Sequence, residues 1–177
     1  MSVTSNSNVL HFDIGTFSLE GDRKWQPLLK EKYNQVQPRL SPDGRWLAYV
    51  SDESGRYEVY IRPFPDVDKG RWQVSTSGGN SPLWSRDGKE LFYRNGDAVM
   101  AVSVKIDPNL NLETPRVLFN GKYVSFDPQR DEVDTWDISP DGKRFIMIKD
   151  ISEAGGPRKI NIVVNWFEEL KRKVPVD

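Results

Sequence analysis

Short runs of leucine, aromatic and β-branched residues recur along the chain, separated by polar segments rich in glycine, aspartate, serine and proline. The most regular of these runs lie at residues 47–50, 91–93 and 145–148. Each one follows a tight-turn sequence, and a single apolar residue precedes that turn. An apolar position, a turn and a β-rich run are typical of a β-hairpin. The pattern therefore predicts an all-β chain assembled from similar hairpins.

One segment occurs three times without gaps, at residues 38–50, 82–94 and 136–148. Its centre is Ser-Pro-Asp-Gly in the first and third copies, and Arg86 replaces the proline in the second. The turn tolerates this change, because aspartate bonds the backbone two residues on and glycine accepts positive φ. The repeated serines, Ser41, Ser85 and Ser139, are 44 and then 54 residues apart. A period near 40 to 50 residues predicts propeller blades of four short strands.

Further strands are predicted around these hairpins. The third strands of the blades are expected at residues 57–62, 98–104 and 160–166, and fourth strands at 72–75 and 116–119. Residues 9–14 and 25–29 are predicted to be the last two strands of a first blade, and residues 167–173 a short helical turn. We expect about three to four four-stranded antiparallel blades. An ordinary β-sandwich with coincidental turns is the alternative, and three gapless copies of one hairpin argue against it.

The predicted strands divide the chain into a disordered segment and one propeller-type domain. The segment is residues 1–8, and the domain is residues 9–177. Within the domain we expect a partial blade (9–33), two blades (34–77 and 78–120) and a second partial blade (121–177).

The repeat resembles the TolB-type, WD-like propeller repeat, in which an apolar residue, Ser-Pro-Asp-Gly and an aromatic-rich strand follow one another. Residues 40–49, 84–93 and 138–147 carry this motif. Residues 161–171 are similar to the C-terminal end of propeller domains attached to bacterial serine/threonine kinases. The resemblance implies a sensor-like or scaffolding propeller. It places the propellers of those relatives outside the cytoplasm, while the compartment of this chain stays open. No kinase motif accompanies it, and fold alone does not fix function.

Rings of that family have six or seven blades, whereas about two complete and two partial blades are expected here. A partial blade exposes unpaired backbone groups that invite pairing with another strand. The strands predicted at 9–14 and 25–29 could complete the last blade within one chain or between two. Two chains of about three and a half blades come close to a ring of seven or eight, so we expect a homo-oligomer, most simply a two-fold dimer.

Composition narrows the range of partners. The 25 basic and 26 acidic residues leave a net charge of −1, which gives no electrostatic reason to expect nucleic acid or an anionic membrane as partner. No stretch approaches the roughly 18 apolar residues of a membrane span, and the first eight residues do not form a signal sequence. We therefore expect a soluble chain.

The chain has no cysteine and one histidine, His11, so thiolate chemistry and sites with two histidine ligands within one chain are excluded. His11 is interpreted as a strand residue with a local hydrogen bond, since the sequence lacks a Gly-x-Ser-x-Gly nucleophile elbow. The composition still permits a cation with oxygen ligands, such as calcium.

Ligands of propellers usually meet the loops that enter the innermost strands. These loops supply the candidate ligand-binding residues Asn34, Gln37, Arg39, Asn80 and Ser81, with Gln35 beside them. Asp131, Asp134 and Asp137 belong to the densest acidic stretch and are the candidate metal ligands. Small polar residues of this kind suit a peptide, a sugar or a cation, and the alternative is that they are solvated turn residues.

Two functions of different classes follow. The first is a non-catalytic propeller module that binds a protein, a peptide or a small ligand. The alternative is a calcium-dependent hydrolase of the lactonase or esterase type, in which the ion polarises a carbonyl and activates water. That alternative rests on analogy with other propellers. A truncated product without a function of its own is a third reading that the sequence leaves open.

Overall fold

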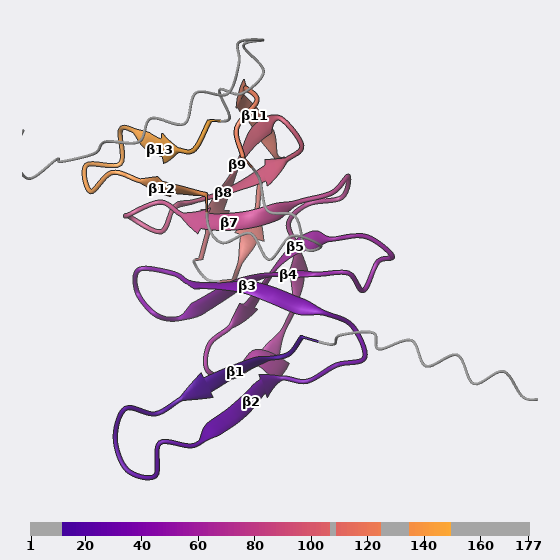
Figure 1. Ribbon diagram of the computed structural model, residues 1–177, viewed down its shortest axis with the longest axis vertical. Helices are drawn as coiled ribbons and strands as arrows, with labels where there is room; N and C mark the ends of the chain where they lie inside the picture. Colours follow the sequence, from indigo (N-terminus) through magenta and orange to yellow (C-terminus); the bar gives the residue numbers. More distant parts are fainter. Residues whose placement is uncertain (1–11, 107–108, 125–134, 150–177) are drawn as a thin grey trace, which may run out of the picture.

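The computed structural model describes residues 12–106, 109–124 and 135–149. Within these ranges the regular structure is β, apart from one 3-10 turn, η1 (Val67–Lys69). The sheets follow one another in chain order along the longest axis of the molecule (Figure 1). No helix in this part of the chain is long and apolar enough to cross a membrane.

Two sheets are complete blades. The first has the strand order β3 (Gln35–Leu40), β4 (Trp46–Ser51), β5 (Glu58–Pro63) and β6 (Trp72–Gln73). The second contains β7 (Asn80–Trp84), β8 (Glu90–Asn95), β9 (Ala98–Lys105) and β11 (Arg116–Asn120), with the short β10 (Asn111–Leu112) also paired to β9. All pairings are antiparallel.

A two-stranded sheet lies at each end of this pair. The N-terminal one consists of β1 (Ile14–Phe17) and β2 (Trp25–Leu29), and the C-terminal one of β12 (Trp136–Ile138) and β13 (Phe145–Met147). We refer to them as the N-terminal and C-terminal half-blades. The architecture confirms the predicted all-β class and the partial propeller.

The predicted turn has the same hydrogen bonds in all three copies. In the first copy the Ser41 hydroxyl donates to Asp43 Oδ1 at 2.5 Å and accepts from the Trp46 amide at 3.0 Å, while the Arg45 amide donates to Asp43 Oδ1 at 3.1 Å. The corresponding bonds form around Ser85 and Ser139. The glycines of the three turns have φ of 69–70°. The serine and aspartate thus organise the hairpin, and the glycine adopts the left-handed conformation it requires.

The core lies between the blades because successive side chains of a strand point to opposite faces. In β4, Leu47 and Tyr49 pack towards the N-terminal half-blade, whereas Ala48 and Val50 pack towards the second blade. In β8, Phe92 packs towards the C-terminal half-blade. The central strands are therefore buried on both faces and appear in the sequence as nearly continuous apolar runs.

Side chains also hydrogen-bond backbone carbonyls of a neighbouring blade. The Trp84 indole donates to the Arg39 carbonyl at 3.2 Å, and the Trp136 indole donates to the Ser81 carbonyl at 3.1 Å. Arg86, which replaces the turn proline, donates to the Ile138 carbonyl at 3.1 Å. The arginine that replaces the turn proline therefore joins the second blade to the C-terminal half-blade.

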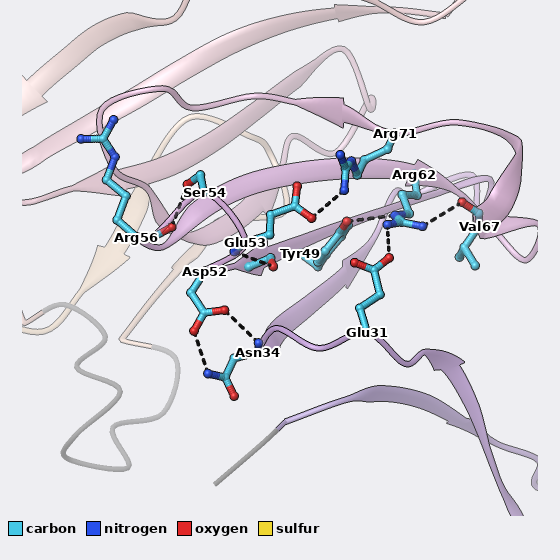
Figure 2. A network of polar contacts seen from close by, with 11 residues as sticks. Glu31, Asn34, Tyr49, Asp52, Glu53, Ser54, Arg56, Arg62, Val67 and Arg71 are labelled. Carbon is cyan, nitrogen blue, oxygen red and sulfur yellow. Dashed lines mark hydrogen bonds and ion pairs between the residues drawn. The ribbon is translucent and has the colours of Figure 1, made fainter. Parts of the chain in front are cut away.

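A polar network joins the N-terminal half-blade to the first blade (Figure 2). Arg62 on β5 donates to the Tyr49 hydroxyl at 2.9 Å, to Glu31 Oε1 at 2.5 Å and to the Val67 carbonyl at 3.4 Å. Glu31 lies in the segment between β2 and β3, so this arginine fixes the path by which the chain enters the first blade.

Residues 9–11 of the strand predicted at 9–14 lie outside the described residues, and the described part is shifted, because β1 is Ile14–Phe17. The backbone of Phe12 is already engaged elsewhere: its amide donates to Asn34 Oδ1 at 3.1 Å, and its carbonyl accepts from the Gln35 amide at 2.8 Å. The pairing with β2 therefore starts at Ile14, opposite Leu29. The predicted disordered segment 1–8, the strand 160–166 and the helical turn 167–173 lie outside the described residues. Strand β10 and η1 were not predicted.

Each end of the array shows an apolar face. Phe17 and Trp25 of the N-terminal half-blade are 57% and 54% exposed. Ile146 and Ile148, in and just after β13, are 67% and 55% exposed. In the complete blades, Ala48 and Phe92, which occupy the same position of the repeat as Ile146, are buried.

Candidate ligand-binding site

The innermost strands β3 and β7 share an unusual backbone at their entry. Gln37 and Ser81 have φ of 53° and 52°, and each precedes a proline. The ladder register of both strands shifts at these residues. Positive φ is uncommon for residues other than glycine, and the same strain at repeat-equivalent positions marks a bulge that both blades retain.

Gln37 and Ser81, two of the predicted ligand-binding residues, are brought together and bond one another. Gln37 Oε1 accepts from the Ser81 amide at 2.8 Å, and Gln37 Nε2 donates to the Ser81 hydroxyl at 3.3 Å. The Gln37 amide thus holds the two bulges side by side. That Gln37 and Ser81 contact a ligand stays a prediction.

The two predicted asparagines also make contacts within the fold. Asn34 donates from its backbone and side-chain nitrogens to both carboxylate oxygens of Asp52, at 2.9 and 2.7 Å (Figure 2). Asn80 Oδ1 accepts from the Ser81 hydroxyl at 3.0 Å, and Asn80 lies opposite Arg94 in the β7–β8 pair. These contacts order the entry to each innermost strand.

A cavity of about 560 Å³ lies beside the innermost strands, and we call it the channel cavity. Its lining includes Arg39, Leu83 and Asp137, which occupy the same position in the three copies of the repeat. The other lining residues are Thr135, Trp136, Ile146 and Ile148. The volume falls in the range of small-molecule and peptide sites. The predicted residue Arg39 and the predicted metal ligand Asp137 therefore share one cavity.

The cavity combines two charges with an apolar wall. Burial lowers the pKa of the Arg39 guanidinium, and the nearby Asp137 carboxylate partly offsets that effect. Arg39 Nη1 donates to the Pro38 carbonyl at 3.1 Å, and Asp137 Oδ1 accepts from the Ile138 amide at 2.7 Å. A cation and an anion thus line the cavity together with Leu83.

The described lining does not supply a nucleophile and base in the arrangement that covalent catalysis needs. Its one hydroxyl, on Thr135, donates to the Val124 carbonyl at 2.8 Å. The arrangement suits recognition of a ligand that carries charge and apolar surface.

The structure describes only part of the predicted metal site. Asp131 and Asp134 lie outside the described residues, and Asp137 lines the channel cavity. Within the described ranges, histidine, cysteine and carboxylate side chains do not gather in a group of three that could hold a metal ion. The calcium site stays a prediction.

The ligand-binding residues predicted from the sequence are polar loop residues, and they do not include the apolar side of the cavity. Leu83 could have been found from the alignment of the three copies, because it shares a position with Arg39 and Asp137. Ile146 and Ile148 gave no such signal, since an alternating strand pattern does not reveal which face stays exposed.

Arg94 was also missed. It stands where the other two copies of the repeat have Val50 and Ile148, and it is fully buried. Its Nη2 donates to the Gly96 carbonyl at 3.1 Å, whereas Nε and Nη1 have no partner among the described residues. The guanidinium carbon lies 5.9 Å from the centre of the Tyr123 ring.

No protein-family model matches the chain. A similar curated protein is dipeptidyl aminopeptidase BI from Pseudoxanthomonas mexicana, which is 35% identical over 88 residues. These residues are 49% of this chain and 12% of the peptidase, so the chain spans a small part of that relative.

Two solved structures are also similar. A putative TolB from Agrobacterium tumefaciens has a TM-score of 0.45 at 21% identity, and the match covers 61% of this chain and 41% of that chain. TolB from Acinetobacter baumannii has a TM-score of 0.48 at 19% identity, and the match covers 69% of this chain and 28% of that chain. The fold itself rests on the threefold repeat and the sheet topology: the chain is an all-β array of propeller blades that carry a TolB-like motif.

Proposed function

We propose that the chain is a non-catalytic propeller module that binds a peptide or a peptide-like small ligand in the channel cavity. The observation that carries the proposal is the row of repeat-equivalent residues, Arg39, Leu83 and Asp137, which lines a cavity of about 560 Å³. Propeller blades present such rows towards a common axis, so side chains that differ between blades give the site its specificity. The curated relative is named for action on peptides, which supports a peptide as the ligand class.

A peptide panel tests this function. Immobilised peptides of varied sequence would be screened with the protein, and hits measured by isothermal titration calorimetry. Ile146→Asp, which places a charge in the apolar wall, is expected to weaken binding at least tenfold. Val117→Asp, at another exposed apolar position, on β11 and away from the cavity, serves as the matched control. Peptides that bind wild type and Ile146→Asp with equal affinity would place the binding surface elsewhere.

We further propose that the partner at the open ends is a second copy of the chain. The described part of the N-terminal half-blade has the two outer strands of a blade, and that of the C-terminal half-blade has the two inner strands. If β13 of one copy pairs with β1 of the other, each junction becomes a four-stranded sheet. Two complete blades from each chain and two shared blades then make a ring of six, not the seven or eight expected from the sequence.

Sedimentation velocity tests the second copy. We expect a dimer for the wild type and a monomer for Phe17→Lys and Trp25→Lys, because a lysine at either exposed apolar position of the N-terminal half-blade would be buried at the junction. Val117→Lys is the control and should leave the dimer intact. A wild-type chain that sediments as a monomer at high concentration would rule the dimer out.

The location outside the cytoplasm, implied by the resemblance, is likewise a proposal.

A further inference from the structure

Ile146 occupies a position of the repeat that packs against the following blade or half-blade elsewhere in the chain. Ala48, its equivalent in the first blade, belongs to one core cluster with Trp84 of the second blade. Phe92, its equivalent in the second blade, belongs to one cluster with Ile138 of the C-terminal half-blade. Trp84 and Ile138 share a position as well. Both interfaces within the chain therefore join the same two positions, which we call the inserting position (48, 92 and 146) and the receiving position (40, 84 and 138).

Leu40 stands at the receiving position of the first blade, but it is open to solvent. Trp84 and Ile138 are buried, whereas Leu40 is 48% exposed. It borders an apolar hollow of about 270 Å³ between the N-terminal half-blade and the first blade, whose lining includes Ile14 of β1. Among the described residues, the first blade thus has a receiving position without an inserted side chain. Ile146, which is 67% exposed, is an inserting residue without a receiving position.

These two unmatched positions lie towards opposite ends of the array. The hollow beside Leu40 adjoins the N-terminal half-blade, Ile146 belongs to the C-terminal half-blade, and the complete blades lie between the two half-blades (Figure 1). A second copy can present its β13 to the hollow in the same direction as the interfaces within the chain. When each copy does so, two identical junctions close a ring.

Side-chain size supports the match between Ile146 and Leu40. At the two interfaces within the chain, a small alanine meets a tryptophan and a phenylalanine meets an isoleucine. At the junction an isoleucine meets a leucine. Facing positions that balance larger against smaller side chains fill a core evenly. None of the three combinations joins two large aromatic or two small residues, so the junction fits the pattern of the other two.

We infer that Ile146 of one copy inserts beside Leu40 of a second copy, in the apolar hollow between its N-terminal half-blade and its first blade. The inference rests on the proposed association of two copies and names the contact that joins them. Pairing of β13 with β1 of the second copy puts Ile146 in the same sheet as Ile14, which lines the hollow. Ile146 also lines the channel cavity, so the second copy borders the ligand site on that side.

Cross-linking of introduced cysteines tests the contact. The chain has no cysteine of its own, so a short bis-maleimide joins only the introduced thiols, and it demands a less strict geometry than a disulfide. Leu40→Cys/Ile146→Cys is expected to give a covalent dimer in which residue 40 of one chain is linked to residue 146 of the other, as mass spectrometry of the digest would show. Val117→Cys/Ile146→Cys and the two single variants should stay monomeric on a denaturing gel. All three positions are exposed in a single chain, so the substitutions leave its core intact.

Leu40→Lys provides a second readout, because it places a charge in the apolar hollow. Sedimentation velocity should show a monomer for this variant and a dimer for Val117→Lys. A Leu40→Lys chain that remains dimeric would show that the hollow is not part of the junction.

The outcomes separate the inference from the proposals on which it rests. If the wild type is a dimer but residues 40 and 146 are not linked, the inference is wrong and the association of two copies stands. If they are linked within one chain, the chain closes on itself and the inference is wrong as well. A wild type that is monomeric at high concentration removes both the inference and the proposed dimer. Peptide binding is measured separately, so its failure would reject the ligand proposal without changing the cross-linking result.

Discussion

Arg94 occupies a position at which the other two copies of the repeat have an aliphatic side chain. Its equivalents, Val50 and Ile148, show that the blade does not need a charge there. Arg62 is a useful contrast, because its guanidinium donates to Tyr49, Glu31 and a carbonyl. Two buried arginines of one chain therefore differ in how fully their donors are satisfied.

We expect Arg94→Leu to raise the free energy of unfolding by about 1 kcal/mol or more, because it removes a buried charge with unpaired donors. Arg62→Leu should lower it by about 2 kcal/mol or more, since it leaves Glu31 and the Tyr49 hydroxyl without their donor. Urea denaturation measures both values. A destabilised Arg94→Leu would show that the guanidinium has a partner in the folded protein.

Two buried tyrosines make stability depend on alkaline pH. Burial raises the pKa of Tyr49 to about 12, although the hydrogen bond from Arg62 acts in the opposite direction. Burial also raises the pKa of Tyr93 to about 12, and Glu58 adds to this effect. Both groups bind protons more tightly folded than unfolded, so their contribution is complete below about pH 10 and is lost as the pH rises towards 12.

Accordingly, the melting temperature of the wild type should fall between about pH 10 and 12, and Tyr93→Phe should flatten this decline. The ionisation can be followed independently by phenolate absorbance. A profile that is identical in wild type and Tyr93→Phe would contradict the role of burial.

At the scale of the element, the turn of the repeat is the part that the sequence predicts best. Its hydrogen bonds are local, so serine, aspartate and glycine at fixed spacing suffice to define them. Strand β1 was misplaced because its start depends on Asn34 and Gln35, about twenty residues away, which bind the backbone of Phe12. The short β10 depends on the far end of β9 and does not follow a copy of the repeated turn.

The site was predictable to a similar extent. The entry loops were found because polar residues before an innermost strand carry a sequence signal. The contacts that engage Gln37, Ser81 and Asn34 depend on how blades face each other, which a single sequence does not show. The pairing of Arg39 with Asp137 in one cavity joins residues from two blades that are not adjacent.

Gly88, in the second copy of the turn, allows a direct test of the turn's left-handed backbone conformation. Gly88 has φ of 70°, and a Cβ there would lie 3.7 Å from Pro42, which is an ordinary contact. Steric crowding is therefore small, and backbone strain alone should make Gly88→Ala less stable by about 1 kcal/mol. Gly88→Asn should cost less, because asparagine tolerates the left-handed conformation better. Equal losses in the two variants, measured by denaturation, would contradict this explanation.

At the scale of the whole molecule, indole–carbonyl bonds connect one blade to the next. Trp136→Phe keeps most of the aromatic packing but leaves the Ser81 carbonyl without its donor, which should cost about 1 kcal/mol. The C-terminal half-blade should then exchange its amide hydrogens faster, while β3–β6 keep their protection. Trp25→Phe is the matched control, since that tryptophan is 54% exposed. A uniform loss of protection along the chain would show that the blades unfold together.

The bond from Trp84 to the Arg39 carbonyl has a consequence for how such a chain can change in length. Its acceptor is a backbone atom, which exists whatever side chain the preceding blade has at that position. A duplicated unit of 44 residues would therefore meet a ready acceptor on its neighbour and offer one to the next. Genetic duplication or loss of a unit leaves the hydrogen bond between neighbouring blades unchanged. The array can therefore gain or lose whole blades during evolution, while the residues that line its cavity change by single substitutions.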